Sequence, residues 1–277
     1  MPDFFETVDS IGIVENHIQG VLKLEETEAR KLLKRYREIR GDLRDRLDTT
    51  RADTFTAQQL RGVLAQVDGA IDAMNRSLIE GMGPGTEKAA LQGIEDLLSE
   101  IRRFDQEFGG AVTPINLNVA LIAQDVNNLL LSKYQSSLDA YSEQLRSQVA
   151  DTLTNAAIEE VSLSQVTQRL GQFFLGEEWK LTQIARTELH NVYNLGKQKG
   201  MEETQENFLP DLQKTLIHPM DSRTGADSKY ANRLNLIVDI NKPFEYTWNG
   251  KKRIYMVPPD RPNDRSIMVP YRESWNK

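Results

Sequence analysis

No glycine or proline occurs between Pro114 and Gly171, and apolar residues recur at helical spacing in this stretch. These residues are Ile122, Val126, Leu129, Tyr134, Leu138, Tyr141, Leu145, Val149 and Leu153. The pattern predicts a long helix over residues 111–160. Forty helical residues span about 60 Å, which is more than one small domain can bury. We therefore expect part of this helix to pack on a partner or on copies of itself. The alternative is a pair of helices broken near residues 132–137.

Three stretches upstream carry the same helical period, at residues 22–47, 56–80 and 86–108. A threonine at the start of the second and third stretches can cap each helix. The sequence Gly-Met-Gly-Pro-Gly at 81–85 predicts the end of the second helix, because glycine permits a left-handed cap and proline cannot continue a helix. The short connections favour one antiparallel bundle over residues 1–110.

The pattern changes after Pro210. Before it, we expect a short helix over 162–176 and a further helix over 177–206. After it come short β-type runs at 215–218, 235–238, 244–248, 253–257 and 267–269. Asn249-Gly250 lies between two of these runs and predicts a two-residue hairpin turn, since both positions tolerate positive φ.

Together these patterns predict an α+β fold that is mostly α, with a long-helix bundle followed by a small β-rich C-terminal module. We divide the chain into an N-terminal helical bundle over 1–110, a long helix over 111–160 and a module over 161–277. Within the module, helices at 162–206 precede the β-rich part at 212–277.

The composition limits the chemistry that the chain can carry. It contains no cysteine, which excludes disulfides, thiolate metal sites and a cysteine nucleophile. No apolar run reaches the roughly 18 residues of a membrane span, and the first residues do not resemble a signal peptide, so we expect a soluble chain without a membrane anchor. Residues 1–180 carry 19 Lys and Arg against 29 Asp and Glu, whereas residues 181–277 carry 15 against 12. The basic end is compatible with docking on an acidic surface or on DNA phosphates, and equally with an ordinary solvated surface.

Three short polar motifs lie in the last hundred residues, at 184–188, 221–224 and 258–265. The first falls on a predicted helix, where Arg186 and Glu188 point in different directions and cannot pair with each other. We expect each to find its partner in the second motif.

The expected pairs are Arg186 with Asp221 and Glu188 with Arg223, which would hold the β-rich part onto the helix. The residues of this polar staple are Arg186, Thr187, Glu188, Asp221, Arg223 and Thr224. The functional alternative makes Glu188, His190 and Asp221 a catalytic or divalent-metal site, provided that their side chains converge. Lys251, Lys252 and Arg253 form the densest basic run and could contact phosphate, although hairpin tips are often charged simply to prevent edge pairing.

The order of these motifs resembles a known family. The matching residues are Ala185-Arg186-Thr187-Glu188, Tyr193-Asn194, Gly196, Asp221-Ser222-Arg223-Thr224, Pro243-Phe244 and the segment Pro258 to Pro270. Over residues 160–277 the chain resembles the C-terminal region of phage head morphogenesis proteins, the Mu F-like minor head protein family. Many members carry a histidine where this chain has Asp227, Ser228 and Lys229, and some carry late cysteines suited to zinc. The chain departs from the family at both points, so we expect no zinc site.

The resemblance implies a minor capsid protein of a tailed bacteriophage or prophage, associated with the portal and acting in head assembly and DNA packaging or ejection. Its expected partners are the portal protein, other capsid components and packaged double-stranded DNA, and the long helices favour a homo-oligomer or ring. The expected location is the virion, with the host cytoplasm during assembly. We expect no cofactor, no bound metal and no enzymatic activity. The alternatives are a DNA-binding scaffold protein and a metal-dependent or transferase enzyme.

Overall fold

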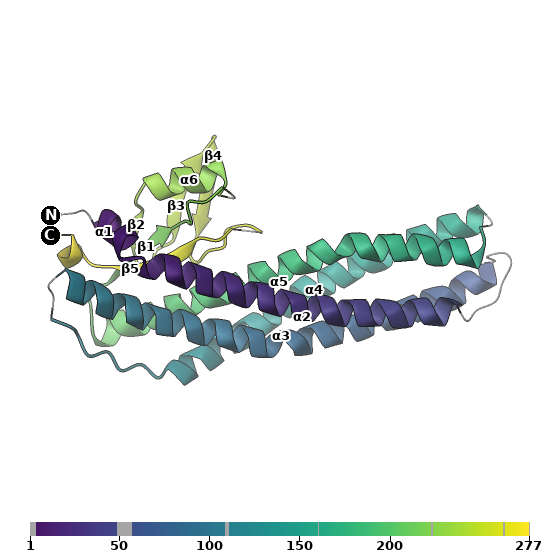
Figure 1. Ribbon diagram of the computed structural model, residues 1–277, viewed down its shortest axis with the longest axis horizontal. Helices are drawn as coiled ribbons and strands as arrows, with labels where there is room; N and C mark the ends of the chain where they lie inside the picture. The colour runs from purple at the N-terminus through teal and green to yellow at the C-terminus, as the bar shows by residue number, and fades with distance from the viewer. Residues whose placement is uncertain are drawn as a thin grey trace. The chain divides into compact units, whose positions relative to one another are not determined.

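The computed structural model describes residues 4–48, 57–108, 111–159, 161–222, 224–262 and 264–276 (Figure 1). The helices are α1 (Phe4–Ile11), α2 (Ile13–Asp48), α3 (Ala57–Glu107), α4 (Val119–Ile158), α5 (Leu163–Asn207) and α6 (Ala226–Arg233). The strands are β1 (Gln213–Ile217), β2 (Ile237–Asp239), β3 (Phe244–Trp248), β4 (Lys251–Tyr255) and β5 (Ile267–Tyr271), and a short 3₁₀ helix, η1, covers Glu273–Trp275. The predicted α+β fold that is mostly α is confirmed. No helix in the described part of the chain is both long enough and apolar enough to span a membrane.

The chain divides into two compact units built from discontinuous segments. The first contains Met1–Glu26, Pro84–Leu130 and Arg186–Lys277, and the second contains Thr27–Gly83 and Leu131–Ala185. Each of the four long helices therefore contributes one segment to each unit. This division differs from the three consecutive segments that the sequence suggested at 1–110, 111–160 and 161–277, because sequence order does not indicate which segments of long helices return to the same core.

The expected break at residues 81–85 is absent, because α3 continues through Pro84. Proline inside a helix removes one backbone hydrogen bond and costs about 3 kcal/mol. Buried apolar residues continue the helical stripe on both sides of it, including Leu78, Met82 and Ala89. Burial of each large side chain stabilises the helix by about 1.5–3 kcal/mol, which is enough to offset the proline. The prediction that Thr86 caps a third helix is therefore wrong, and its hydroxyl instead donates to Asn127 Oδ1 of α4 at 2.6 Å.

The predicted long helix is confirmed as α4, which begins at Val119 rather than near residue 111 and runs without a break through residues 132–137. The two helices expected at 162–176 and 177–206 are one helix, α5, which continues through Gly176. Its start is fixed by a capping box. Ser162 Oγ accepts a hydrogen bond from the backbone N–H of Gln165 at 3.3 Å, and Gln165 Oε1 accepts one from the backbone N–H of Ser162 at 2.9 Å. The cap predicted at Thr56 lies outside the described residues.

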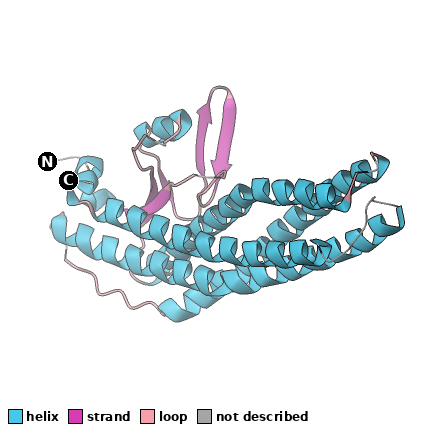
Figure 2. Ribbon diagram, turned by 45° about the vertical axis from the view of Figure 1, so that its right-hand side comes forward, coloured by secondary structure: helices cyan, strands magenta, loops and turns pink. Residues whose placement is uncertain are grey.

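The β-rich part forms a three-stranded antiparallel sheet in the order β2-β1-β5 and a separate hairpin of β3 and β4 (Figure 2). The hairpin predicted at Asn249-Gly250 is confirmed, with φ values of 49° and 74° and Trp248 paired with Lys251. Helix α6 was not predicted, because its sequence lacks a clear apolar stripe. All of these elements belong to the first unit.

The two ends of the chain lie side by side in the first unit (Figure 1). The ring of Phe4 contacts those of Phe104, Tyr271 and Trp275, with centroids 5.0–6.2 Å apart. Trp275 Nε1 donates to Asp105 at 3.0 Å. This aromatic cluster joins α1, α3 and the end of the sheet, and so fixes β5 in the position from which it enters the candidate site.

Candidate functional site

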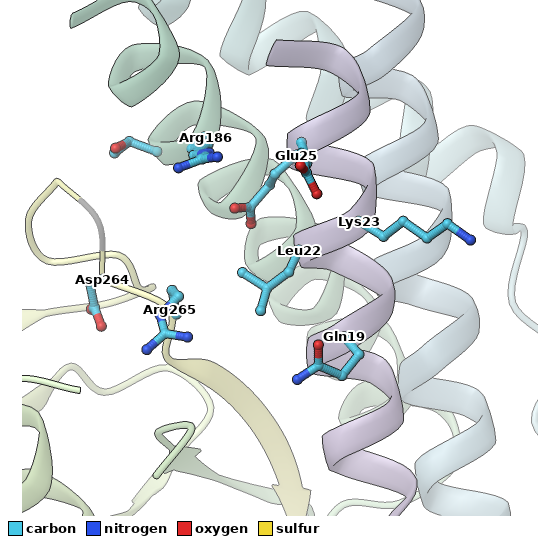
Figure 3. Close-up of a pocket in the computed structure, with 9 residues that line it drawn as sticks. Gln19, Leu22, Lys23, Glu25, Arg186, Asp264 and Arg265 are labelled. Atoms are coloured by element: carbon cyan, nitrogen blue, oxygen red, sulfur yellow. The ribbon is translucent and has the colours of Figure 1, made fainter. Parts of the chain in front are cut away.

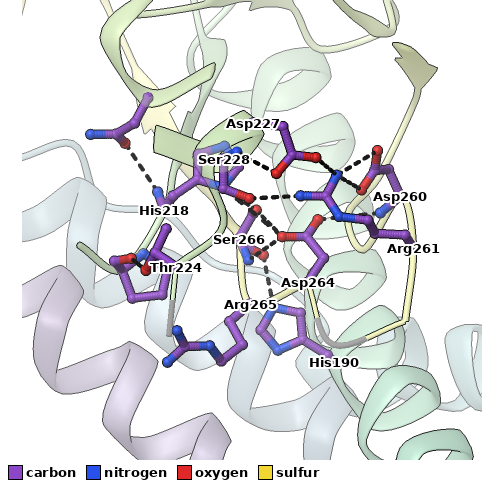
Figure 4. Close-up of polar contacts among 12 residues, drawn as sticks. His190, His218, Thr224, Asp227, Ser228, Asp260, Arg261, Asp264, Arg265 and Ser266 are labelled. Atoms are coloured by element: carbon purple, nitrogen blue, oxygen red, sulfur yellow. Dashed lines mark hydrogen bonds and ion pairs between the residues drawn. The ribbon is translucent and has the colours of Figure 1, made fainter. Parts of the chain in front are cut away.

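The second and third polar motifs meet α5 in the first unit, where the loop between β1 and α6 lies beside the segment that precedes β5 (Figure 4). At the centre is His190 on α5, which is buried. Its Nε2 contacts the backbone oxygen of Ser266 at 2.7 Å, and its Nδ1 contacts the Glu25 carboxylate of α2 at 2.7 Å. Both partners accept hydrogen bonds, so both ring nitrogens carry protons. Burial lowers the pKa of His190, but the Glu25 carboxylate outweighs it, and the net effect is a raised pKa.

Asn194 lies one turn further along α5 and strengthens the same connection. Its amide group donates to the backbone oxygens of His190 and Ser266, both at 3.1 Å. Its Oδ1 accepts from the Met268 backbone N–H at 2.9 Å. Helix α5 therefore holds β5 and the residue before it through buried hydrogen bonds.

Beside this connection lies a second buried group of Ser266, Asp264 and His218, with exposures of 0%, 7% and 3%. Ser266 Oγ contacts both Asp264 Oδ1 and His218 Nδ1. A carboxylate can only accept, so the serine donates to Asp264 and accepts from the protonated Nδ1 of His218. His218 Nε2 is then unprotonated, and it has no hydrogen-bond partner among the described residues. Burial lowers the pKa of His218 to about 4, which agrees with a neutral ring.

This arrangement does not match a Ser-His-Asp hydrolase. In such a triad the histidine accepts the serine proton and the acid orients the histidine. Here the serine lies between the other two groups, its proton goes to Asp264, and its side chain is fully buried. Ser266 therefore lacks both the access and the base that a nucleophile needs.

The predicted pair of Arg186 with Asp221 is wrong. Asp221 instead accepts from Nη1 and Nη2 of Arg265 at 2.7 and 2.6 Å, in a bidentate ion pair. Thr224 Oγ1 donates to Pro219 O, and it lies 3.2 Å from Asp221 Oδ1. The loop from Pro219 to Thr224 is thus held to the entrance of β5, whereas Arg186 is exposed and forms no ion pair with the described residues.

The other predicted staple residues are placed as follows. Thr187 is half-buried, and its Oγ1 has no hydrogen-bond partner within the described ranges. Glu188 is buried on α5. Its predicted partner, Arg223, lies outside the described residues, so this pair stays a prediction.

The alternative site of Glu188, His190 and Asp221 does not assemble as a metal or catalytic centre. His190 uses both ring nitrogens for Glu25 and Ser266, and Asp221 is engaged by Arg265. In the described part of the chain, no group of three or more Asp, Glu or His side chains is arranged to hold a metal ion.

The basic run at the hairpin is largely balanced by neighbouring carboxylates. Lys252 lies 2.6 Å from Glu245 across the strand pair. Arg253 lies 3.8 Å from Asp227 and 3.6 Å from Asp260. Lys251, at the turn, is exposed. The phosphate contact predicted for these three residues stays a prediction. Of the three cations, Lys251 is the one without a carboxylate neighbour among the described residues.

A related group of charges fixes α6. Arg261 contacts Asp227 at 2.8 Å and Asp260 at 3.0 Å, and donates to Ser228 Oγ at 2.8 Å. Asp227 and Ser228 lie at the start of α6, where a carboxylate is also favoured by the helix dipole. Arg261 therefore joins α6 to the third motif.

Two cavities border the network. One, of about 410 Å³, is lined by residues of α2, by Arg186 and Thr187 of α5, and by Asp264 and Arg265 (Figure 3). The other, of about 210 Å³, is lined by His218, the loop between β1 and α6, and Arg261.

Sequence reasoning missed several central residues, namely Glu25, His218, Asp264, Arg265 and Ser266. Asp264 and Arg265 belong to the third motif, which marked them as candidates, but the sequence did not indicate their partners. Glu25 carried no signal, because it lies 165 positions from His190 and on a different helix.

Comparison with known proteins adds no assignment. No protein-family model matches the chain, and no curated protein and no solved structure shows significant similarity to it.

Proposed function

We propose that the chain is a minor capsid protein of a tailed bacteriophage or prophage, associated with the portal vertex and acting in head assembly and DNA packaging or ejection. The proposal begins from the motif resemblance over residues 160–277. The observation that best supports it is that the third motif meets both of the others. Asp221 of the second motif forms an ion pair with Arg265, and Arg186 and Thr187 of the first motif line the same cavity as Asp264 and Arg265. Motifs that match by chance have no reason to meet in space.

In this proposal the network has a structural role. Its central groups, His190, Asn194 and Ser266, are buried and hydrogen-bonded to one another, so they hold the β-rich part on α5. The partner surfaces are then sought elsewhere. Leu175 and Trp179 lie one turn apart on α5 and are 58% and 60% exposed, so together they form an apolar surface that a partner could cover.

The test is the protein content of purified particles. Particles from cells that carry the gene, after infection or prophage induction, should contain the chain at tens of copies or fewer per head, and a reconstruction should place it at the portal vertex. Finding it only in the soluble fraction of the host, with none in the particles, would refute the proposal.

A second candidate is a DNA-binding scaffold, which exposed Lys251 at the hairpin tip favours. Lys252 and Arg253 already have carboxylate neighbours, so this surface offers little net positive charge. Duplex binding by the whole chain that weakens steeply with salt, and that Lys251→Gln reduces, would favour the scaffold. The absence of a salt-dependent complex removes it.

A further inference from the structure

The larger cavity, of about 410 Å³, has walls of balanced charge. Its lining includes three cationic side chains, Lys23, Arg186 and Arg265, and three anionic ones, Glu25, Glu26 and Asp264. In Figure 3, Arg186 comes from α5 and Arg265 from the segment before β5, while Lys23 points away from both. What the cavity can bind depends on which of these groups already have partners.

Most of the charged groups are already engaged. Arg265 is held by Asp221, Glu25 contacts His190, and Asp264 accepts from Ser266. Lys23 and Glu26 also interact with other groups of the chain. These groups shape the cavity, but they have little remaining need for a partner.

One charged group remains, and it can donate hydrogen bonds. Arg186 is exposed and forms no ion pair with any residue in the described part of the chain. Its guanidinium carries five N–H donors, and it needs acceptors to match them. The unused capacity of the cavity therefore calls for acceptor oxygens.

From this inventory we propose that the cavity binds the carboxylate of an acidic side chain from a protein partner. The guanidinium of Arg186 matches a carboxylate with two parallel hydrogen bonds. Leu22, also in the lining, can cover the methylene groups of a glutamate. A polyanion such as DNA would meet Glu25, Glu26 and Asp264 at close range, whereas one carboxylate adds a single charge to a balanced wall. The inference goes beyond the proposed capsid role, which leaves the partner chemistry of this cavity open.

The test uses the full chain and two short blocked peptides that differ only in charge, acetyl-Gly-Glu-Gly-amide and acetyl-Gly-Gln-Gly-amide. Binding is followed by the shifts of ¹⁵N-labelled arginine side-chain signals. We expect the glutamate peptide to bind at millimolar concentration or below, at least fivefold more tightly than the glutamine peptide. Arg186→Gln should weaken binding at least fivefold.

Arg102→Gln is the matched control. Arg102 is exposed on α3, belongs to the same unit, and forms no ion pair within the described residues. This variant makes the same charge change and should leave binding unchanged. Arg186→Gln should keep the melting temperature of the unaltered chain, which separates loss of a ligand contact from loss of folding.

Three results would overturn the proposal. These are equal binding of the two peptides, equal binding by Arg186→Gln and the unaltered chain, and tighter binding of inorganic phosphate or a 20-base-pair duplex than of the glutamate peptide. Free succinate tested beside the peptide distinguishes a small carboxylate from a peptide side chain, and tighter binding of succinate would contradict a protein partner. None of these results bears on whether the chain is found in particles.

Discussion

Among the buried residues, Ser266 makes the most demanding connection, because one hydroxyl serves both Asp264 and His218. Its backbone oxygen also accepts from His190 and Asn194. At the scale of single residues, buried hydrogen bonds stabilise the candidate site, because a buried polar group that loses its partner cannot turn to water instead.

Replacing Ser266 by alanine should therefore destabilise the chain by about 2–3 kcal/mol, because Asp264 and the His218 Nδ1–H both lose a buried partner. Urea denaturation followed by circular dichroism measures the change. Ser147→Ala on the exposed face of α4 is the control and should stay within about 0.5 kcal/mol. Equal stability of the two variants would contradict the orientation that we assign to the Ser266 hydroxyl.

His218 predicts an acid-dependent loss of stability. Burial lowers its pKa to about 4 in the folded chain, whereas the unfolded chain titrates near 6.5. Between these values the unfolded chain binds more protons, so the contribution is complete above pH 6.5 and is lost as the pH falls toward 4. The difference corresponds to about 3 kcal/mol. The lowered pKa of Asp264 extends the same trend below pH 4.

The free energy of unfolding, measured from pH 7.5 to 4, should fall on the acid side of pH 6.5. His218→Asn removes the titrating ring and should flatten much of this slope. His190 acts in the opposite sense, because its raised pKa gives stability that is lost as the pH rises above its folded value. A slope that His218→Asn leaves unchanged would show that His218 is not its source.

The residues of the site could be predicted only in part. The second motif indicated that the segment after β1 carries a polar residue that needs a distant partner, and Asp221 has one in Arg265. The identity of the partner did not follow, since Arg186 and Arg265 are equally good partners for Asp221 from sequence alone. The choice depends on which arginine the fold brings within 3 Å, and the entry of β5 beside the loop decides it for Arg265.

At the scale of elements, two glycines bring the backbones of α3 and α5 into close contact in the first unit. A Cβ built on Gly93 would lie 2.1 Å from the backbone oxygen of Tyr193, and one built on Gly196 would lie 2.6 Å from the backbone oxygen of Ala90. Both obstacles are main-chain atoms, which cannot move without shifting a helix. The two glycines therefore set the distance between the helices, and with it the position of Lys197, which forms a buried ion pair with Glu100 at 2.6 Å.

Gly93→Ala should consequently destabilise the chain by more than about 2 kcal/mol, because overpacking at a backbone contact forces the helices apart. Gly69→Ala on the same helix is the control, since a Cβ there meets open space. The control should stabilise the chain by about 0.5–1 kcal/mol through helix propensity. Thermal and urea unfolding measure the stability of both variants. A destabilisation of equal size at both positions would contradict the close contact of α3 and α5 at Gly93.

The elements themselves were more predictable than the site. The apolar period located α2, α4 and most of α5, and Asn249-Gly250 located the hairpin. The errors fell where local and tertiary preferences oppose each other. Pro84 and Gly176 are local signals to end a helix, but neighbouring buried side chains keep the helix intact. Helix α6 is the converse case, because Arg261 holds a segment without a strong helical pattern.

At the scale of the whole molecule, the proposed homo-oligomer requires contact between copies of a chain whose net charge is -7. The exposed stripe of α5 in the second unit carries no charge. Its members are Gln168, Gln172, Leu175, Gly176 and Trp179. The charged neighbours Arg169 and Lys180 are paired with Glu159 and Glu177 inside the unit. A surface without charge avoids repulsion between identical chains, which supports the proposed homo-oligomer.

If copies associate through this stripe, Trp179→Glu should weaken self-association at least tenfold, because it places like charges at the centre of a symmetric contact. Sedimentation velocity over a range of concentrations gives the dissociation constant. Leu121→Glu on α4 is the matched control, since Leu121 is 52% exposed, belongs to the first unit and undergoes the same change from apolar to acidic.

The chain has no cysteine, so Gly176→Cys offers an independent measurement. Under mild oxidation it should form a disulfide-linked dimer when two stripes face each other. A dissociation constant that Trp179→Glu leaves unchanged, with no disulfide-linked dimer from Gly176→Cys, would place the contact between copies on another surface.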